Sequence, residues 1–211
     1  VRTSNGQTGY LAAFSGNLCG SNSHSFFVPP VYDLLKPDGF FKIEEEQISA
    51  INHQIGQLQN CDRYLELQQK MERETASSQQ ALSEARKVLK AAKEKREQRR
   101  LHRPNENEQV AMIRESQHQK AEFKRLERYW KEQISEIKTE LESFSSQIEA
   151  LKAERRNRSA ALQQKLFQQF NFLNAKGETR NLCAIFEETV QKTPPAGAGE
   201  CAAPKLLQFD Y

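Results

Sequence analysis

The feature that most constrains this chain is a heptad repeat between Ile113 and Leu151. Its a positions are Ile113, Lys120, Glu127, Ile134, Leu141 and Ile148, and its d positions are Ser116, Phe123, Trp130, Ile137, Phe144 and Leu151. Nine of these twelve side chains are apolar. A stripe this narrow is typical of a helix packed along a seam against another helix, because a helix on a globular core needs a wider apolar face. The repeat therefore predicts a coiled coil.

A partner helix is predicted directly upstream, beginning after Gly39 and ending before Pro104. Its seam residues are first Ile48, Ile51, Ile55 and Leu58, and then Met71, Thr75, Ser78, Leu82, Ala85, Leu89 and Ala92. The spacing shortens by one residue near Cys61 and Tyr64. We interpret this slip as a stammer within one continuous helix.

The two helices are separated by a short break at Arg103-Pro104-Asn105. Asn105 and Glu108 have the spacing of a capping box that starts the second helix. Two long helices joined by so short a turn must run antiparallel, so the numbers of facing residues should add up to about 209. The sequence thus predicts a hairpin within one chain rather than a parallel dimer.

The segments on either side of the hairpin contain shorter elements. Asn5-Gly6 is a strong β-turn signal, and a strand is expected over residues 10–14. Further on, Phe26, Tyr32 and Leu34 are among the apolar anchors expected to dock an irregular segment. This part of the chain is predicted to be the remnant of a β-hairpin, followed by a docking segment.

Beyond the heptads, the second helix is expected to continue, with or without a kink at residues 157–159, through an apolar face that ends before Gly177. That face consists of Leu162, Leu166, Phe167, Phe170 and Leu173. A shorter helix is expected from Leu182 to Val190 with Asn181 as its cap, followed by a Pro/Gly-rich connection at residues 194–199.

These elements predict a mainly α fold, in which a long antiparallel coiled-coil hairpin stands on a small α+β base with a short N-terminal β-hairpin remnant. Residues 1–43 form the β-hairpin remnant and the docking segment. Residues 44–158 form the coiled-coil arm, with its turn near residues 103–106. Residues 159–211 complete the base with short helices and the Pro/Gly connection, and we interpret the chain as a truncated piece of a longer polypeptide.

Composition limits the function classes. Only 37% of the residues are hydrophobic and 28% are charged, which suits a seam better than a thick core. The net charge of +3 excludes a strongly basic protein, so any affinity for nucleic acid must come from local clustering. Neither a membrane span nor an export signal is recognisable, and four widely spaced cysteines indicate reduced thiols, so a cytoplasmic location is expected.

No residue of this sequence is nominated as catalytic, and no cofactor or metal site is expected, because its histidines and cysteines lack the required spacings. Residues 200–207 distantly resemble the zinc-binding helix of toxin-type deaminases, in which a Cys or His ligand is followed two residues later by a glutamate. Here Ala203 stands at the glutamate position relative to Cys201. The role of this segment is left open.

The densest cluster of positive charge lies between Arg86 and Arg103. Nine basic residues there face only Glu94 and Glu97. We single out six of them as candidate RNA-binding residues, namely Lys90, Lys93, Arg96, Arg99, Arg100 and Arg103. The alternative is an ordinary solvated helix face, which the lack of interleaved aromatic residues favours.

Three blocks of the sequence carry a resemblance to a known family. They are residues 1–16 (VRTSNGQTGYLAAFSG), the FFVPPVYD run at 26–33 with PDGFF at 37–41, and residues 194–208 (PPAGAGECAAPKLLQ). Together they resemble the long N-terminal extension of a subset of bacterial RluA-type RNA pseudouridine synthases. The likeness is specific in these blocks and only compositional in the coiled coil.

The resemblance implies that the chain precedes a catalytic domain, whose His-Arg-Leu/Ile-Asp motif holds the catalytic aspartate. The sequence His102-Arg103-Pro104-Asn105 lacks that aspartate, so no catalytic residue is carried over. The parent protein would convert uridine to pseudouridine in structured RNA, either rRNA or tRNA. Its partners would be that RNA and its own C-terminal catalytic domain, with no DNA. A competing hypothesis is a coiled-coil spacer or oligomerisation module without a nucleic-acid role.

Overall fold

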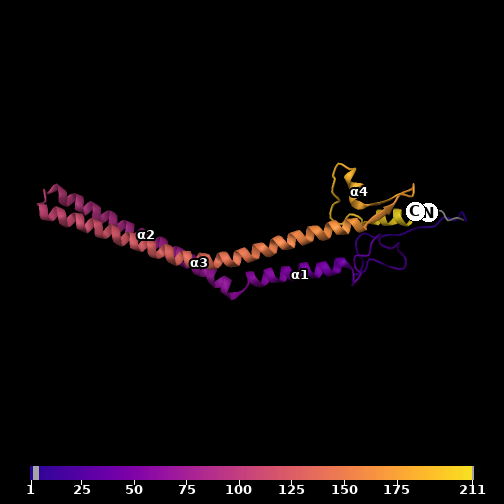
Figure 1. Cartoon of the computed structure of the whole chain (residues 1–211), viewed down its shortest axis with the longest axis horizontal. Helices are drawn as coiled ribbons and strands as arrows, with labels where there is room; N and C mark the ends of the chain where they lie inside the picture. The colour runs from indigo at the N-terminus through magenta and orange to yellow at the C-terminus, as the bar shows by residue number, and fades with distance from the viewer. Residues whose placement is uncertain (2–4, 211) are drawn as a thin grey trace. The chain divides into compact units, whose positions relative to one another are not determined.

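The computed structural model describes residues 1 and 5–210, and the fold is mainly helical, with 67% of the residues in helices. Its elements are α1 (Phe40–Gln59), α2 (Asp62–Leu101), α3 (Glu106–Gln169), β1 (Asn171–Leu173), β2 (Thr179–Asn181), α4 (Leu182–Glu187) and α5 (Ala202–Asp210) (Figure 1). The predicted fold class, with its long helix packed on other helices, is confirmed.

The chain divides into two compact units. Unit 1 comprises Val1–Gln54 and Leu151–Tyr211, and unit 2 comprises Ile55–Ala150. The predicted domain limits lie after residues 43 and 158, at other positions than these boundaries. Helix α1 continues through residue 43, and α3 continues through residue 158. The three-part division made from the sequence stays a prediction.

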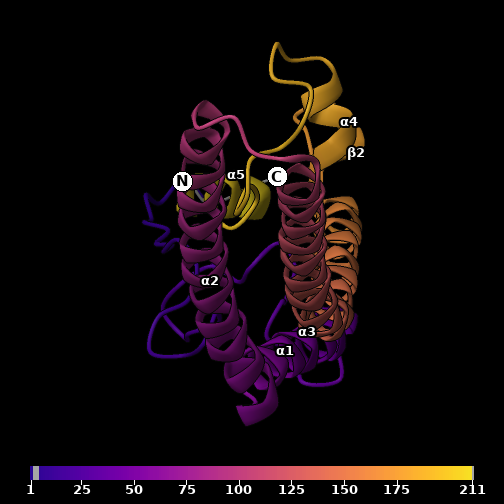
Figure 2. The same ribbon diagram turned by 90° about the vertical axis from the view of Figure 1, so that its left-hand side faces the viewer.

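Unit 2 is an antiparallel helical hairpin, in which α2 lies beside the first part of α3 (Figures 1 and 2). Near one end the rings of Tyr64 and Phe144 are 5.5 Å apart between centroids. Farther along, the Arg86 guanidinium lies 5.8 Å from the centroid of the Phe123 ring. Because these pairs join distant parts of one chain at the predicted offset, the antiparallel pairing within one chain is confirmed.

The turn of the hairpin is also as predicted. Helix α2 ends at Leu101, and α3 begins at Glu106. The Asn105 side chain accepts a hydrogen bond from the Glu108 backbone NH at 2.9 Å, and the Glu108 carboxylate accepts one from the Asn105 backbone NH at 2.8 Å. This reciprocal pair is the expected capping box, and it satisfies two backbone donors that the helix itself leaves free.

One continuous helix from Gly39 to the turn was predicted, and this is wrong. Helix α1 ends at Gln59 and α2 begins at Asp62, with Cys61 in an extended conformation at the cap position (φ −71°, ψ 140°). The Asn60 side chain donates to the Gly56 carbonyl at 2.7 Å, a local bond that competes with helix continuation. The one-residue slip in the apolar spacing therefore marks a break rather than a stammer.

The predicted seam of α2 is confirmed, because every position from Met71 to Ala92 in the predicted set is buried or half-buried. In α3 the prediction holds for Ile137 and Ile148, each only 4% exposed. Nearer the turn the predicted d positions Ser116 and Phe123 are half-buried as expected, but the predicted a positions are wrong by one residue. Met112 is buried at 4% exposure, whereas the predicted seam residue Ile113 is 50% exposed.

The same offset applies to the next two heptads of α3. Lys120 and Glu127 are exposed, and the preceding residues Gln119 and Leu126 are half-buried instead. The two parts of the seam meet at Ile137. The seam residues next to it are four positions earlier and four positions later, instead of alternating between three and four. Such a spacing is a stutter, which corrects the drift between the 3.5-residue repeat and the 3.6-residue turn of an α-helix.

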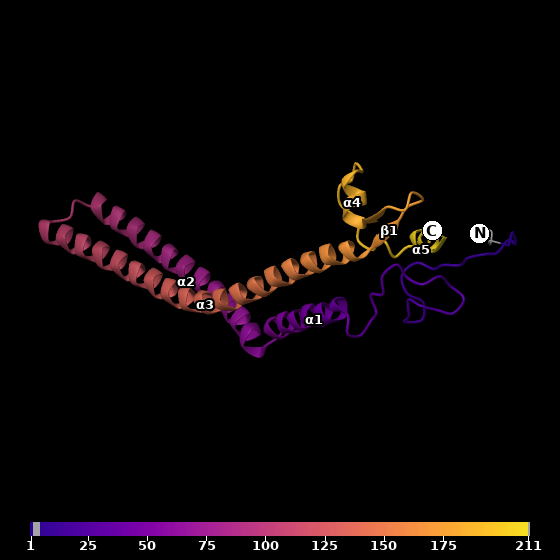
Figure 3. The same ribbon diagram turned by 45° about the vertical axis from the view of Figure 1, so that its right-hand side comes forward.

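In unit 1, α1 lies beside the C-terminal part of α3 (Figure 3). Arg158 of α3 reaches across to α1, where it contacts the Glu44 carboxylate at 3.3 Å and the Gln47 side-chain oxygen at 2.6 Å. Arg155 donates to the Asn52 side chain at 3.1 Å. These polar contacts fix the relative position of the two helices along their common edge.

The core of unit 1 forms around Phe170, which is 1% exposed. The buried residues packed with it are Leu34, Leu166, Phe167 and Leu182. Gly199 lies against the Phe170 ring with φ +94°, and a Cβ atom at this position would be 2.8 Å from two ring carbons. A glycine is therefore required by both its backbone conformation and its close approach to the core.

The helix predicted to extend through Leu173 ends at Gln169 instead. Asn171–Leu173 forms β1, which pairs antiparallel with β2 so that Phe172 faces Arg180. The Asn171 side chain donates to the Gln169 carbonyl at 3.2 Å and thereby satisfies an acceptor at the helix end. The Leu173 NH donates to the Gln208 side chain of α5 at 2.8 Å, a long-range contact that local sequence patterns do not reveal.

Helix α4 begins as predicted but is shorter. The Asn181 side chain accepts a hydrogen bond from the Ala184 NH at 2.9 Å, which confirms the predicted cap. The helix ends at Glu187, and Val190 is fully exposed, so the predicted extension of this helix to Val190 is wrong.

The N-terminal segment contains less strand than predicted. Gly6 has φ +80°, as a tight turn requires, and Val1 and Gly9 exchange two backbone hydrogen bonds. Residues 2–4 of this predicted hairpin lie outside the described part of the chain. Residues 10–14 form no strand, because their described backbone bonds do not build a ladder. The predicted anchor Phe26 is 89% exposed, whereas Leu34 is buried as expected.

Candidate nucleic-acid interface

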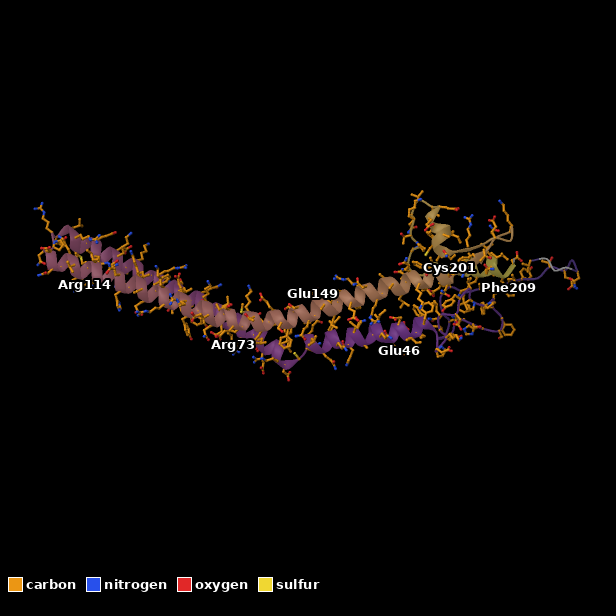
Figure 4. All side chains as sticks on the ribbon, viewed as in Figure 1. Glu46, Arg73, Arg114, Glu149, Cys201 and Phe209 are labelled. Carbon is orange, nitrogen blue, oxygen red and sulfur yellow. The ribbon has the colours of Figure 1, made fainter. Side chains whose placement is uncertain are left out.

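The predicted RNA-binding residues occupy the end of α2 and the turn that follows it. Arg114, labelled in Figure 4, marks this end of the hairpin on α3. Because α2 is a regular helix here, residues three, four and seven apart lie on the same face. The positive charges therefore separate into distinct faces rather than forming one continuous patch.

Four of the six candidates line a single groove between α2 and α3. The groove has a volume of about 450 Å³ and is lined by Leu89, Lys90, Lys93, Arg96, Glu97, Arg100, Ser116 and Lys120. Glu97 is its only acidic residue, and it forms an exposed ion pair with Lys93 at 3.8 Å. The groove consequently has an excess of positive charge.

Lys120 belongs to this groove and was missed by the sequence analysis, which placed it in the apolar seam. The stutter near Ile137 turns Gln119 toward the seam and leaves Lys120 exposed beside Lys90 and Lys93. A lysine at an a position is a polar mismatch in a seam. That mismatch was the sign in the sequence that the heptad register near the turn is displaced by one residue from the register farther along α3.

Arg96 has a different environment from the other candidates. It is 7% exposed, and its guanidinium donates to the Gln119 side chain at 2.5 Å and lies 3.6 Å from the Glu115 carboxylate. A buried guanidinium held by these partners cannot extend to a phosphate in solvent. We therefore treat Arg96 as part of the floor of the groove and not as a direct RNA contact.

Arg99 and Arg103 lie outside this groove. Arg99 forms an ion pair with Glu115 at 3.6 Å and lines a second hollow with His102, Glu108 and Met112. Its positive charge is partly balanced there by the Glu115 carboxylate, which also pairs with Arg96, and Glu108 adds a second negative charge to the lining of the hollow. Arg103, in the turn, has a left-handed backbone conformation with φ 50° and is exposed. The hairpin end thus has one basic face and one neutralised face.

The basic groove suits binding to phosphate and does not suit chemistry on a substrate. Lysine and arginine side chains on a rigid helix pair can neutralise several phosphates without reading base identity. No aromatic residue lines the groove. Unstacked bases would therefore find no stacking platform on it.

Residues 200–207, the segment whose role the sequence left open, connect the N-terminal segment to α5. The Gly16 NH donates to the Glu200 carbonyl at 3.1 Å, and the Ala202 NH donates to the Ser15 hydroxyl at 3.1 Å. Lys205 is only 3% exposed. Its ammonium donates to the Phe14 and Gly16 carbonyls at 2.9 and 3.3 Å. We call residues 14–16 and 200–205 the junction.

Electrostatics at the junction follow from burial. Burial raises the pKa of the Glu200 carboxyl, and the nearby Lys205 ammonium partly offsets this effect. Burial also lowers the pKa of Lys205, while Glu200 opposes that change. The ammonium makes two hydrogen bonds to carbonyl oxygens and lies 4.7 Å from the Phe14 ring centroid, so the arrangement supports a structural contact.

Across the described residues, no group of three or more His, Cys, Asp or Glu side chains is arranged to hold a metal ion, and Cys201 is an exposed free thiol. No described helix has both the length and the apolar composition needed to cross a membrane. No protein-family model, curated protein or solved structure matches this chain.

Proposed function

We propose that this chain contacts RNA phosphates through the basic groove of unit 2. The observation that carries the proposal is the convergence of Lys90, Lys93 and Arg100 from α2 with Lys120 from α3 around one groove. These side chains come from two helices held in register by buried seam contacts. Their positions are therefore fixed relative to one another, which reduces the entropic cost of binding a second charged surface.

We further propose that the chain is the non-catalytic N-terminal region of an RNA pseudouridine synthase. This part of the proposal rests on the resemblance of residues 1–16, 26–33, 37–41 and 194–208 to RluA-type enzymes. The parent protein would isomerise uridine in rRNA or tRNA in the cytoplasm, using a C-terminal catalytic domain. The chain itself would position RNA and would supply no group to the reacting base.

A coiled-coil spacer without a nucleic-acid role is the second candidate. It is favoured by the ion pairs that Glu115 makes with Arg96 and Arg99, because they neutralise part of the basic cluster. The net charge of only +3 also supports it. The two candidates differ in what happens when the groove loses its charge.

The test compares RNA binding by the wild-type chain with that of two fourfold alanine variants. The groove variant changes Lys90, Lys93, Arg100 and Lys120, and the matched distal variant changes Lys70, Arg73, Lys131 and Lys138, which are exposed residues of the same hairpin. Fluorescence anisotropy with transcribed rRNA fragments gives the affinities. We expect the groove variant alone to lose at least about tenfold in affinity. Equal losses in both variants would favour the spacer.

The enzyme class is tested separately with the full polypeptide that contains this chain. Its RNA product would be analysed by mass spectrometry after labelling of pseudouridine. Formation of pseudouridine is the expected result, and the groove variant should lower the rate at limiting RNA concentration more than at saturation. Absence of pseudouridine with all rRNA and tRNA substrates would contradict the enzyme class without affecting the binding measurement.

A further inference from the structure

We infer that the RNA bound by the basic groove is double-helical, with the lysine and arginine side chains contacting the phosphates of both strands. This inference rests on the proposed function and specifies its RNA ligand. It is drawn from the placement of charge on two antiparallel helices, from the side chains that line the groove, and from the charge of the opposite face.

The first argument is the geometry of the charged rows. Lys90, Lys93 and Arg100 lie on one face of α2, and ten residues of helix place the first and last about 15 Å apart along the axis. Lys120 faces them from α3, at a helix separation of about 8 to 10 Å. Positive charge is thus spread both along the groove and across it. A duplex offers phosphates in both directions, whereas a single strand offers one line of them.

The second argument is the absence of base-stacking surfaces. Proteins that bind single-stranded RNA combine a basic groove with exposed aromatic rings on which bases stack. The groove lining contains an aliphatic residue, a hydroxyl and charged residues, but no ring. The seam aromatic Phe123, on the same helix as Lys120, is half-buried, and the Arg86 guanidinium lies over its ring. The groove can therefore recognise a backbone, but it gives single-stranded bases no additional affinity.

The third argument concerns which face of the hairpin end meets the ligand. On the other side, Glu108 and Glu115 line the hollow that contains Arg99. Because Glu115 pairs with Arg96 and Arg99, this hollow has less excess positive charge than the groove and would attract a duplex backbone less strongly. The Ser116 hydroxyl in the groove lining can also accept or donate a hydrogen bond to a 2′-hydroxyl, a group that A-form RNA displays in its wide, shallow minor groove.

The experiment measures binding of the chain to four probes by fluorescence anisotropy at one ionic strength. The probes are an RNA duplex of about 16 base pairs, each of its two strands alone, and the DNA duplex of the same sequence. The strands are designed without self-complementarity. Wild type, the groove variant and the distal variant are compared, and circular dichroism verifies that all three retain the helical hairpin.

We expect the RNA duplex to bind wild type at least about tenfold more tightly than either strand or the DNA duplex. The groove variant should lose this preference and the distal variant should keep it. Single strands that bind as tightly as the duplex would overturn the inference but leave RNA binding by the groove intact. A DNA duplex that binds equally well would overturn the RNA assignment. If no probe distinguishes wild type from the groove variant, the proposed function itself fails.

Discussion

At the scale of single residues, Met112 and Ile113 show how one position of register decides exposure. They are adjacent in α3, yet Met112 is 4% exposed and Ile113 is 50% exposed. The sequence favours Ile113 because it continues the downstream heptads without interruption. The stutter reverses the roles of these two residues. It could not be predicted from local spacing, because packing against α2 decides which residue is covered.

The first prediction tests this register with two aspartate substitutions. Met112→Asp places a carboxylate in the buried seam and should lower the free energy of unfolding by about 3 kcal/mol. Ile113→Asp places it in solvent and should change stability by about 0.5 kcal/mol or less. Thermal denaturation followed by circular dichroism measures both. If Ile113→Asp were the more damaging change, the register near the turn would be the one predicted from the sequence.

Glu200 provides a prediction with a defined direction in pH. Its pKa is raised above the ordinary value of 4.5, chiefly by burial, so the folded state holds the proton more tightly than the unfolded state. The stability contribution of the protonated carboxyl is fully present below pH 4.5 and is lost as pH rises through the folded-state pKa. Glu200→Gln removes this titration, because the amide stays neutral.

The measurement is the melting temperature of wild type and Glu200→Gln between pH 4 and pH 8. The wild type should lose stability relative to the variant as pH rises from about 4.5, and the difference should then level off. Titration of groups that do not interact with Glu200 is common to both proteins and cancels in the comparison, whereas Lys205, whose pKa Glu200 raises, is part of the measured effect. Parallel curves over the whole range would show that burial does not perturb Glu200.

At the scale of elements, local chemistry predicted the features that are determined within a few residues. The Asn105–Glu108 capping box and the Asn181 cap are examples, because each is a bond between a side chain and a backbone NH three residues away. The end of α3 at Gln169 was missed. Its continuation as β1 depends on pairing with β2 and on Gln208 of α5, which are distant in sequence.

A cross-linking prediction tests the antiparallel pairing of α2 and α3. In a chain whose native cysteines are replaced by serine, Arg86→Cys and Glu127→Cys place two thiols at facing positions of the hairpin, where the longer native side chains meet with 4.0 Å between guanidinium and carboxylate. A short bis-maleimide should join them within one chain and give a monomer with altered mobility on a denaturing gel. Cysteines at positions 70 and 118 form the control, because they lie at different heights of the hairpin. Products that consist only of linked dimers would contradict the hairpin.

At the scale of the whole molecule, the sequence predicted the helical hairpin better than it predicted unit 1. Heptad spacing is a local property that repeats over many turns, so errors at single positions do not change the result. Unit 1 instead depends on contacts between the two ends of the chain, such as the bonds from Lys205 to Phe14 and Gly16. Core residues such as Leu34 and Phe170 were recognised from the sequence, but their partners were not, and the predicted anchor Phe26 is exposed.

The same distinction applies to the candidate site. The basic stretch of α2 was identified from its charge alone, whereas the membership of Lys120 and the burial of Arg96 follow from the seam register. The interface therefore contains Lys90, Lys93, Arg100 and Lys120, a set that combines two helices and omits three predicted residues, Arg96, Arg99 and Arg103. Charge density located the region, and packing selected the side chains within it.

The most direct test of RNA binding by this groove is the dependence of affinity on salt concentration. Each phosphate that a side chain neutralises releases counterions, so the logarithm of the association constant should fall linearly with the logarithm of the salt concentration. Affinities of the wild-type chain, the groove variant and the distal variant for a structured RNA are measured at several salt concentrations. We predict a steep slope for wild type and the distal variant, and a slope shallower by about one unit per lost phosphate contact for the groove variant. Identical slopes and affinities for all three proteins would contradict the account.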